Sequence, residues 1–222
     1  MLSVILFLGC GESASTSNAP RTLDDQLHRV EQGLEDKVEL ERETLGSREW
    51  QRLQTAKIRS LTLDHCRFAL ADLESLPKLE SLRVEGTTIT AAALQTICRR
   101  CPDLVHLNLP TTRLTDDDLR ELASLTRLEL LRIGSPLVTD AAVSHLCEPP
   151  QLRFLILEDV PITDEGLEPI AELRDLESLY LNGSTATGLT EEGISRLLVA
   201  RPKLHFHIND RHNRTDPNSH PH

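Results

Sequence analysis

Aliphatic residues recur along this chain in one fixed pattern. An apolar residue is followed three positions later by a second and five positions later by a third, with mostly polar residues between them. This alternation predicts a short β-strand with one buried face. Six copies are clear: Ile58-Leu61-Leu63, Leu79-Leu82-Val84, Leu104-Leu107-Leu109, Leu128-Leu131-Ile133, Leu152-Leu155-Leu157 and Leu176-Leu179-Leu181. Their first members lie 21, 25, 24, 24 and 24 residues apart, so the chain is built from repeats.

A second series of residues keeps step with the first. It consists of Ile89-Thr90-Ala91, Leu114-Thr115-Asp116, Val138-Thr139-Asp140, Ile162-Thr163-Asp164 and Leu189-Thr190-Glu191, with steps of 25, 24, 24 and 27. The threonine can cap a helix, and the acidic residues after it favour the positive helix N-terminus. Leu119, Leu122 and Leu125 then follow at helical spacing, as do Leu167, Ile170 and Leu173. Each repeat is therefore predicted to be a strand followed by a short helix, with the acidic runs at helix starts rather than in a calcium site.

These two patterns resemble the leucine-rich repeat family over about residues 35–208. The Thr-Asp step resembles the cysteine-containing subtype found in F-box adaptors and in many bacterial proteins. The resemblance implies an α/β fold: a right-handed solenoid with parallel strands on the concave face and short helices on the convex face.

The ends of the chain depart from the repeat. Leu23, Leu27, Val30 and Leu34 predict an amphipathic helix, and Val38, Leu40, Leu45, Trp50 and Leu53 predict a degenerate capping repeat whose first leucine is replaced by Glu35. Leu204, Phe206 and Ile208 predict a terminal strand. The expected organisation is a signal and polar linker over 1–20, a helix and capping repeat over 21–57, about six repeats and a terminal strand over 58–208, and a disordered tail over 209–222.

The first nine residues are almost wholly apolar and end at Cys10, after which small polar residues follow. This resembles a bacterial lipoprotein signal, in which Cys10 is lipidated and becomes the mature N-terminus. The cationic residues expected before the apolar stretch are missing, and Phe7 stands where such signals usually have leucine. The alternative is an unrelated apolar N-terminus on a cytoplasmic protein.

Composition narrows the class of function. The 222 residues include 41 leucines but only 3% aromatic residues, so the core is aliphatic. The net charge of −11, without a basic segment, argues against binding to a nucleic-acid backbone. No apolar run reaches the roughly 18 residues of a membrane span.

Cysteines and histidines are the candidates for chemistry. Cys66, Cys98, Cys101 and Cys147 are predicted to be free structural thiols, since Cys98-Arg-Arg-Cys101 has no second pair for zinc; a redox pair there is the alternative. His205 and His207 alternate on the terminal strand, and His212, His220 and His222 follow in the tail. They permit a weak, adventitious metal site, but we predict no metal and no cofactor. Without a catalytic pair or phosphate loop, we predict that the protein is not an enzyme.

The residues between the buried ladder positions should point out of the concave sheet. In the early repeats they are polar, as with Ser60, Thr62, Ser81 and Arg83, whereas later they become apolar. The predicted partner-binding residues are Leu130, Arg132, Phe154, Ile156, Tyr180 and His106, with Arg153, Glu158 and Asn182 at the rim. Exposed apolar clusters rimmed by arginine are typical of interfaces. The alternative is that these side chains only pack on one another.

The sequence therefore predicts a non-catalytic protein-binding or scaffold module. It would bind a protein or peptide with its concave face and be tethered to the cell envelope through Cys10. The alternative function is a substrate-recognition subunit resembling the F-box leucine-rich repeat adaptors of ubiquitin ligases. A third class, an enzyme or an enzyme inhibitor, has no residue evidence in its favour.

Overall fold

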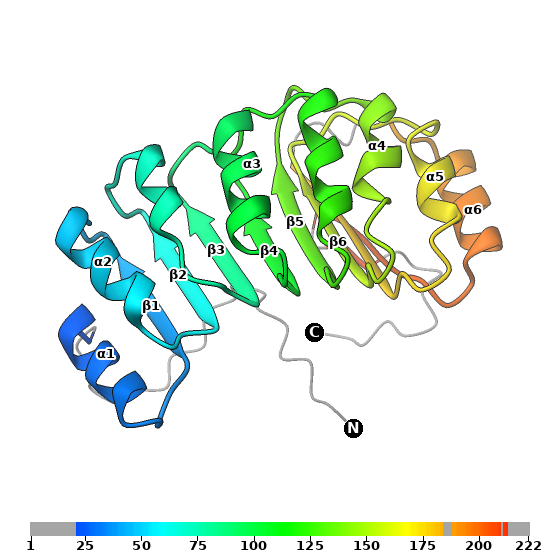
Figure 1. Ribbon diagram of the computed structural model, residues 1–222. Helices are drawn as coiled ribbons and strands as arrows, with labels where there is room; N and C mark the ends of the chain where they lie inside the picture. The colour runs from blue at the N-terminus through cyan, green and yellow to red at the C-terminus, as the bar shows by residue number, and fades with distance from the viewer. Residues whose placement is uncertain (1–20, 184–187, 210, 213–222) are drawn as a thin grey trace.

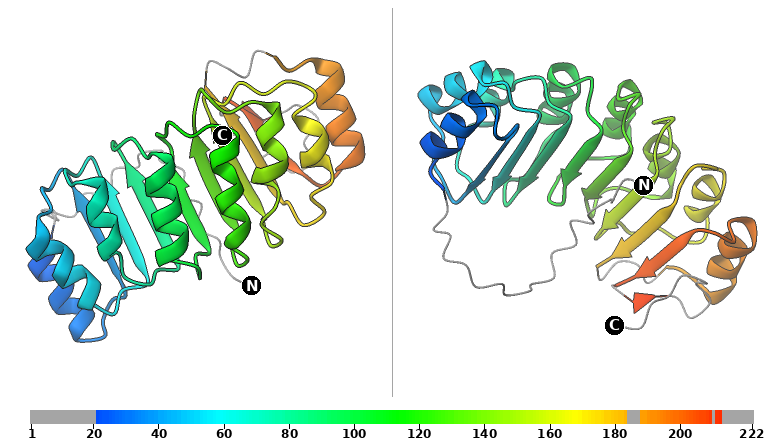
Figure 2. Two further views of the ribbon diagram at one scale, coloured as in Figure 1. Left: turned by 45° about the horizontal axis from the view of Figure 1, so that its top comes forward. Right: turned by 90° about the horizontal axis from the view of Figure 1, so that it is seen from below.

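The computed structural model describes residues 21–183, 188–209 and 211–212, which form one arched sheet backed by helices. Eight parallel strands follow one another in chain order, and a short ninth strand pairs antiparallel with the last of them. The strands line the inner side of the arc and the helices its outer side (Figures 1 and 2). The strands are β1 (Lys37–Glu41), β2 (Ser60–Asp64), β3 (Ser81–Glu85), β4 (His106–Leu109), β5 (Leu130–Gly134), β6 (Phe154–Glu158), β7 (Ser178–Asn182), β8 (His205–Ile208) and β9 (Arg211–His212). The outer elements are α1 (Leu23–Glu31), α2 (Ser47–Thr55), η1 (Leu70–Ser75), α3 (Ala91–Arg100), η2 (Asp117–Ser124), α4 (Asp140–Leu146), α5 (Leu167–Ala171) and α6 (Glu191–Ala200).

The predicted ladder residues form the core. Leu131, Leu155 and Leu179 lie opposite one another on β5, β6 and β7, and all three are completely buried. Every coil therefore packs its leucines against the same positions of the coils before and after it. This coil-to-coil packing explains why the spacing of the leucines is so regular.

The outer elements also follow the sequence pattern. Leu119, Leu122 and Leu125 are completely buried, so one face of this segment packs on the sheet. The segment η2 is a 3-10 helix rather than an α-helix. Its tighter winding places residues three apart on one face, which matches the spacing of the three leucines.

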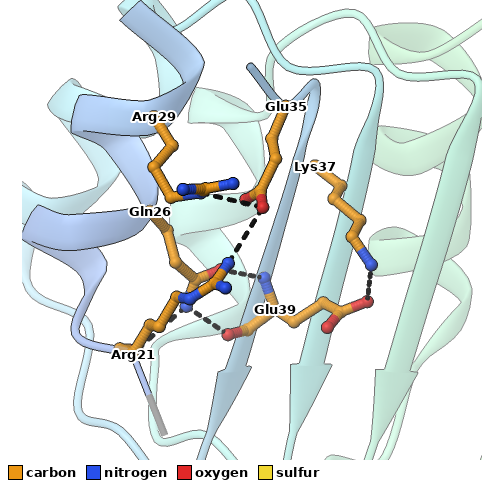
Figure 3. A network of polar contacts seen from close by, with 6 residues as sticks. All are labelled: Arg21, Gln26, Arg29, Glu35, Lys37 and Glu39. Atoms are coloured by element: carbon orange, nitrogen blue, oxygen red, sulfur yellow. Dashed lines mark hydrogen bonds and ion pairs between the residues drawn. The ribbon is translucent and has the colours of Figure 1, made fainter. Parts of the chain in front are cut away.

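The helix α1 closes the N-terminal edge of the sheet. The side-chain amide of Gln26 donates to the Glu39 carbonyl oxygen at 2.6 Å, and its Oε1 accepts from the Glu39 N–H at 2.7 Å (Figure 3). These bonds occupy backbone groups of the edge strand β1 that a neighbouring strand would otherwise use. Leu27 and Val30 are buried as predicted. The prediction for Leu34 is wrong: it lies beyond the end of the helix and is 60% exposed.

Glu35 has a structural reason to replace the first leucine of the capping repeat. Its carboxylate accepts hydrogen bonds from Arg29 Nε and Arg21 Nη1, each at 2.9 Å (Figure 3). The hydrogen bond from Arg29 is the largest cause that lowers the pKa of Glu35 below its usual value. The open end of the solenoid thus carries an ion-pair cluster where the inner repeats carry a buried leucine.

The Thr-Asp steps connect successive repeats, which the sequence pattern did not predict. The carboxylate of each aspartate accepts two bonds from the threonine one repeat later, one from its backbone N–H and one from its hydroxyl. The pairs are Asp116 with Thr139 at 2.7 and 2.7 Å, Asp140 with Thr163 at 2.8 and 2.6 Å, and Asp164 with Thr190 at 2.8 and 2.6 Å. The aspartates therefore do more than complement a helix dipole, because they link the convex ends of neighbouring coils.

The links between repeats explain why positions 166 and 193 are occupied by glycine, as Gly166 and Gly193. A Cβ atom at Gly166 would collide with the Asp140 carboxylate, and one at Gly193 would collide with the Asp164 carboxylate. Both carboxylates are held in place by two hydrogen bonds to the next threonine. The glycines therefore leave room for the links between repeats.

The hydrogen bonds between Asp164 and Thr190 should make the stability of the protein depend on pH. Hydrogen bonds from Thr190 lower the pKa of Asp164 below its usual value near 3.8. Because the folded state then binds its proton less readily than the unfolded state, the contribution to stability is present above that value and lost as the pH falls below it. We expect Asp164→Asn to lower the denaturation midpoint at pH 7 and to differ less from wild type below pH 3. Urea titrations at both pH values measure this, and an equal difference at both would contradict it.

The cysteines of the described part are free. The thiol of Cys66 donates to the Leu40 carbonyl oxygen at 3.4 Å, and that of Cys101 donates to the Pro77 carbonyl oxygen at 3.2 Å. Burial raises the pKa of Cys98 and of Cys147 to about 12, so neither thiol ionises near neutral pH. These environments fit structural thiols and not a reactive pair.

Candidate partner-binding face

The strands β4, β5 and β6 place the predicted binding residues on the concave face. Side chains alternate along a strand, so the buried leucines force the residues between them to point the other way. The register puts Leu130 beside Phe154 and Arg132 beside Ile156. Neighbouring strands lie about 4.8 Å apart, so these side chains form one continuous surface.

Leu130, Phe154 and Ile156 form the apolar centre of this face, which we name the concave patch. All three are half-buried, in contrast to the completely buried Leu131 and Leu155 between them. The structure thus brings together three of the four apolar residues that were predicted. Part of each side chain remains available to a partner.

Two arginines flank the concave patch and are held by carboxylates. Arg132 pairs with Glu158 of the next strand. The Arg153 guanidinium lies 5.3 Å from the centroid of the Phe154 ring, within the range of a cation–π contact. Arg153 also donates to Glu177 at 2.6 and 2.8 Å and to Glu129 at 3.2 Å, and the bond to Glu177 is the largest cause that raises its pKa. The rim is therefore a fixed charge network.

Tyr180 does not belong to this exposed surface. Its register position beside Ile156 is as expected, but only 4% of the residue is exposed. Its ring stacks on His207 of β8, with centroids 4.4 Å apart and ring planes 14° apart, and the ring of His205 lies edge-to-face with it at a centroid distance of 6.1 Å. The prediction that Tyr180 is exposed is wrong, because the histidines of the terminal strand cover the ring.

His106 lies at the other side of the concave patch. It stands beside Leu130 in the register and is exposed to solvent. Desolvation lowers the pKa of His106, while the carboxylates of Glu129 and Glu80 oppose this shift. A largely neutral imidazole at neutral pH can donate and accept hydrogen bonds at the edge of the patch. Ser60, Ser81, Thr62 and Arg83 continue the concave face as a polar surface toward the N-terminus.

Other predicted features are not part of this face. Cys10, His220 and His222 lie outside the described residues, and no side chain is described for His212. Within the described ranges, no group of three or more His, Cys, Asp or Glu could hold a metal ion. None of the helices described is long and apolar enough to cross a membrane.

Comparison with known proteins identifies the fold. The chain matches no family model and no curated protein. Among solved structures it is similar to an internalin of Listeria monocytogenes, with 22% identity, a TM-score of 0.53, and coverage of 76% of this chain and 52% of the internalin. It is also similar to internalin C2 of the same species, with 19% identity, a TM-score of 0.55, and coverage of 78% and 80% of the two chains.

The chain spans about half the length of the first of these internalins. Internalins are leucine-rich repeat proteins, so the likeness, together with the parallel sheet and the short outer helices, confirms the predicted solenoid.

Proposed function

We propose that this protein is a non-catalytic protein-binding module that holds a protein or peptide segment on its concave face. The observation that carries the proposal is the concave patch of Leu130, Phe154 and Ile156. A chain with only 3% aromatic residues places a phenylalanine, partly exposed, in the middle of its inner sheet. An apolar centre with an arginine rim is the arrangement from which binding hot spots are commonly built.

The sheet beneath the concave patch supports this proposal. The strand residues next to Leu130, Phe154 and Ile156 are buried in the core, so the backbone that carries the patch is already ordered before a partner binds. The net charge of −11 favours a partner with basic groups, and this attraction should weaken with added salt. A short segment with apolar and basic side chains therefore fits the face best.

The test replaces the centre of the concave patch. We expect Phe154→Ala with Ile156→Ala to weaken the affinity for the partner, because each truncated hot-spot side chain removes about 2 kcal/mol, or roughly thirtyfold in Kd. A partner captured by the wild-type protein is identified by mass spectrometry. Its purified form is then titrated into wild type and variant by calorimetry.

A matched control separates binding from folding. Leu137 is 46% exposed and lies in the connection between β5 and α4, outside the concave face, so Leu137→Ala should leave the affinity unchanged. Circular dichroism should show that the double variant remains folded. Retained affinity in a folded double variant would place the binding surface elsewhere.

The F-box-like adaptor has less support than the binding module. An adaptor subunit of that kind needs a separate helical module before its repeats. Residues 21–57 do not supply that module, because they form α1, the strand β1 of the common sheet, and α2.

We further propose that the module is attached to the cell envelope by a lipid on Cys10. The support is the apolar stretch that precedes Cys10 and the small polar residues that follow it. Intact mass spectrometry of the membrane fraction tests this: a diacylglyceryl mass on a chain starting at Cys10 is expected, and an unmodified Met1 excludes the anchor.

A further inference from the structure

An open depression of about 520 Å³ lies between the segments that lead into β7 and β8. Three basic side chains line it, those of Arg174, Arg201 and Lys203. Within the described part of the chain, none of the three forms an ion pair with a carboxylate. Uncompensated positive charge therefore gathers at one place in a chain whose net charge is −11.

The guanidinium of Arg201 is held in place but only partly satisfied. Its Nη2 donates hydrogen bonds to the carbonyl oxygens of Arg174 and Leu176, at 3.0 and 2.7 Å. Its Nη1 is buried and has no hydrogen-bond partner among the described residues. Desolvation lowers the pKa of Arg201, although the charge of Asp175 opposes this shift. An anion that enters the depression would restore stabilisation that this guanidinium loses by burial.

The balance of charge in the depression favours a single carboxylate. Its three basic residues outnumber its two acidic ones, Asp175 and Glu177, by one. Glu177 already accepts hydrogen bonds from Arg153 at 2.6 and 2.8 Å, so it does not compensate the other cations fully. A carboxylate carries one negative charge and pairs well with arginine, whereas a phosphate group carries nearly two.

The depression is continuous with the concave patch. Ser178 and His205 belong to its lining, and in the register Ser178 lies beside Phe154 while His205 lies beside Ser178. With neighbouring strands about 4.8 Å apart, His205 lies about 10 Å from Phe154, a distance that about three residues of an extended chain span. A segment whose apolar side chain contacts Phe154 can therefore reach the depression with its end.

We propose that this depression binds the C-terminal carboxylate of the partner segment, with Arg174, Arg201 and Lys203 supplying the positive charge. The inference rests on the proposed function. A segment with apolar and basic side chains always carries one carboxylate, that of its own C-terminus, if it ends the partner chain. Because β8 is the last of the parallel strands, a segment that crosses the sheet in this direction ends near its edge. Capture of a terminal carboxylate is a recurring mode of peptide recognition.

Two synthetic libraries of random heptapeptides test the proposal, one ending in free carboxylates and the other in carboxamides. Each library is passed over the immobilised full-length protein, and the bound peptides are identified by mass spectrometry. We expect enrichment from the carboxylate library alone, with an apolar residue about three positions before the C-terminus. Equal capture from both libraries, capture from neither, or capture of amidated peptides through an internal acidic side chain would overturn the proposal. This comparison uses the wild-type protein and does not depend on the folding of a variant.

Removal of charge from the depression is the second arm of the test. For the most enriched carboxylate peptide, Arg174→Gln with Lys203→Gln should raise Kd by at least about tenfold, because two charge-assisted contacts are lost. Both side chains are exposed, so circular dichroism should show that the fold is retained. The matched control is Lys78→Gln with Arg113→Gln, which removes the same charge from two exposed positions that do not line the depression. We expect the control to bind as the wild type does. An equal loss in both double variants, or no loss in either, would overturn the proposal.

The variant Phe154→Ala with Ile156→Ala separates this inference from the proposed function. If carboxylate and carboxamide peptides are captured alike and this variant weakens both, the concave patch binds the segment and only the carboxylate site is overturned. If capture requires the free carboxylate but this variant binds as the wild type does, the depression still binds a C-terminal carboxylate and the proposed function is overturned.

Discussion

Replacing Leu155 by alanine is expected to lower the free energy of unfolding by about 2–5 kcal/mol. Leu155 is completely buried in the middle strand of the later repeats, between Leu131 on one side and Leu179 on the other. Removing its side chain takes contacts from both neighbouring coils and leaves a cavity that the rigid sheet cannot close. Chemical denaturation followed by circular dichroism measures the loss.

The damage should also be local at first. Each coil of a solenoid contacts mainly its neighbours, so Leu155→Ala should increase hydrogen exchange most over residues 128–181. Leu137→Ala, at a position 46% exposed, serves as the control and should change stability by less than about 1 kcal/mol. A uniform increase of hydrogen exchange along the chain would contradict the assigned register. A decrease in the free energy of unfolding as small as that of the control would contradict it as well.

The arch and its core follow from the sequence because they depend on one periodic property. Leu131, Leu155 and Leu179 recur at a constant spacing, and only a strand-and-turn repeat buries all of them on one side. The same reasoning fixes which residues face the concave side. Leu130, Phe154 and Ile156 could therefore be assigned to that face without coordinates.

Features that depend on one residue reaching a particular neighbour could not be predicted in this way. The hydrogen bonds that Thr163 donates to the Asp140 carboxylate join residues 23 positions apart, and the sequence pattern shows the two Thr-Asp steps without showing that they are in contact. The recurring glycine, represented by Gly166, was a usable signal, since a small residue at corresponding places near the helix starts of two repeats suggests a close approach.

The exposure of Tyr180 was mispredicted for a related reason. The alternation of side chains along β7 correctly places Tyr180 on the concave face. The exposure of its ring, however, depends on the side chains of the next strand. There His207 stacks on the ring, and the alternation along one strand does not show which side chains of the next strand cover it. Truncating Tyr180 would therefore disturb the end of the solenoid as well as any binding surface.

Gly134 lies close to the backbone of the preceding coil at Pro110. A Cβ atom at this position would lie 2.9 Å from the Pro110 carbonyl carbon, closer than real Cβ contacts, and would collide with its oxygen. Backbone atoms cannot rotate away as a side chain can. The Gly134 carbonyl oxygen also accepts bonds from the Thr112 N–H and hydroxyl, each at 2.8 Å, so the glycine cannot withdraw without losing them.

We therefore expect Gly134→Ala to destabilise the protein by about 1–3 kcal/mol, the usual cost of forcing extra atoms into a packed region. The matched control is Gly46→Ala, where a Cβ atom would meet only the end of the Glu49 side chain at 3.3 Å. The lower entropy of the unfolded chain partly offsets any cost there, so the control should change little. Urea denaturation of both variants measures the difference. Equal midpoints would mean that β4 and β5 can separate at this end without cost, which would contradict the close approach of Gly134 to Pro110.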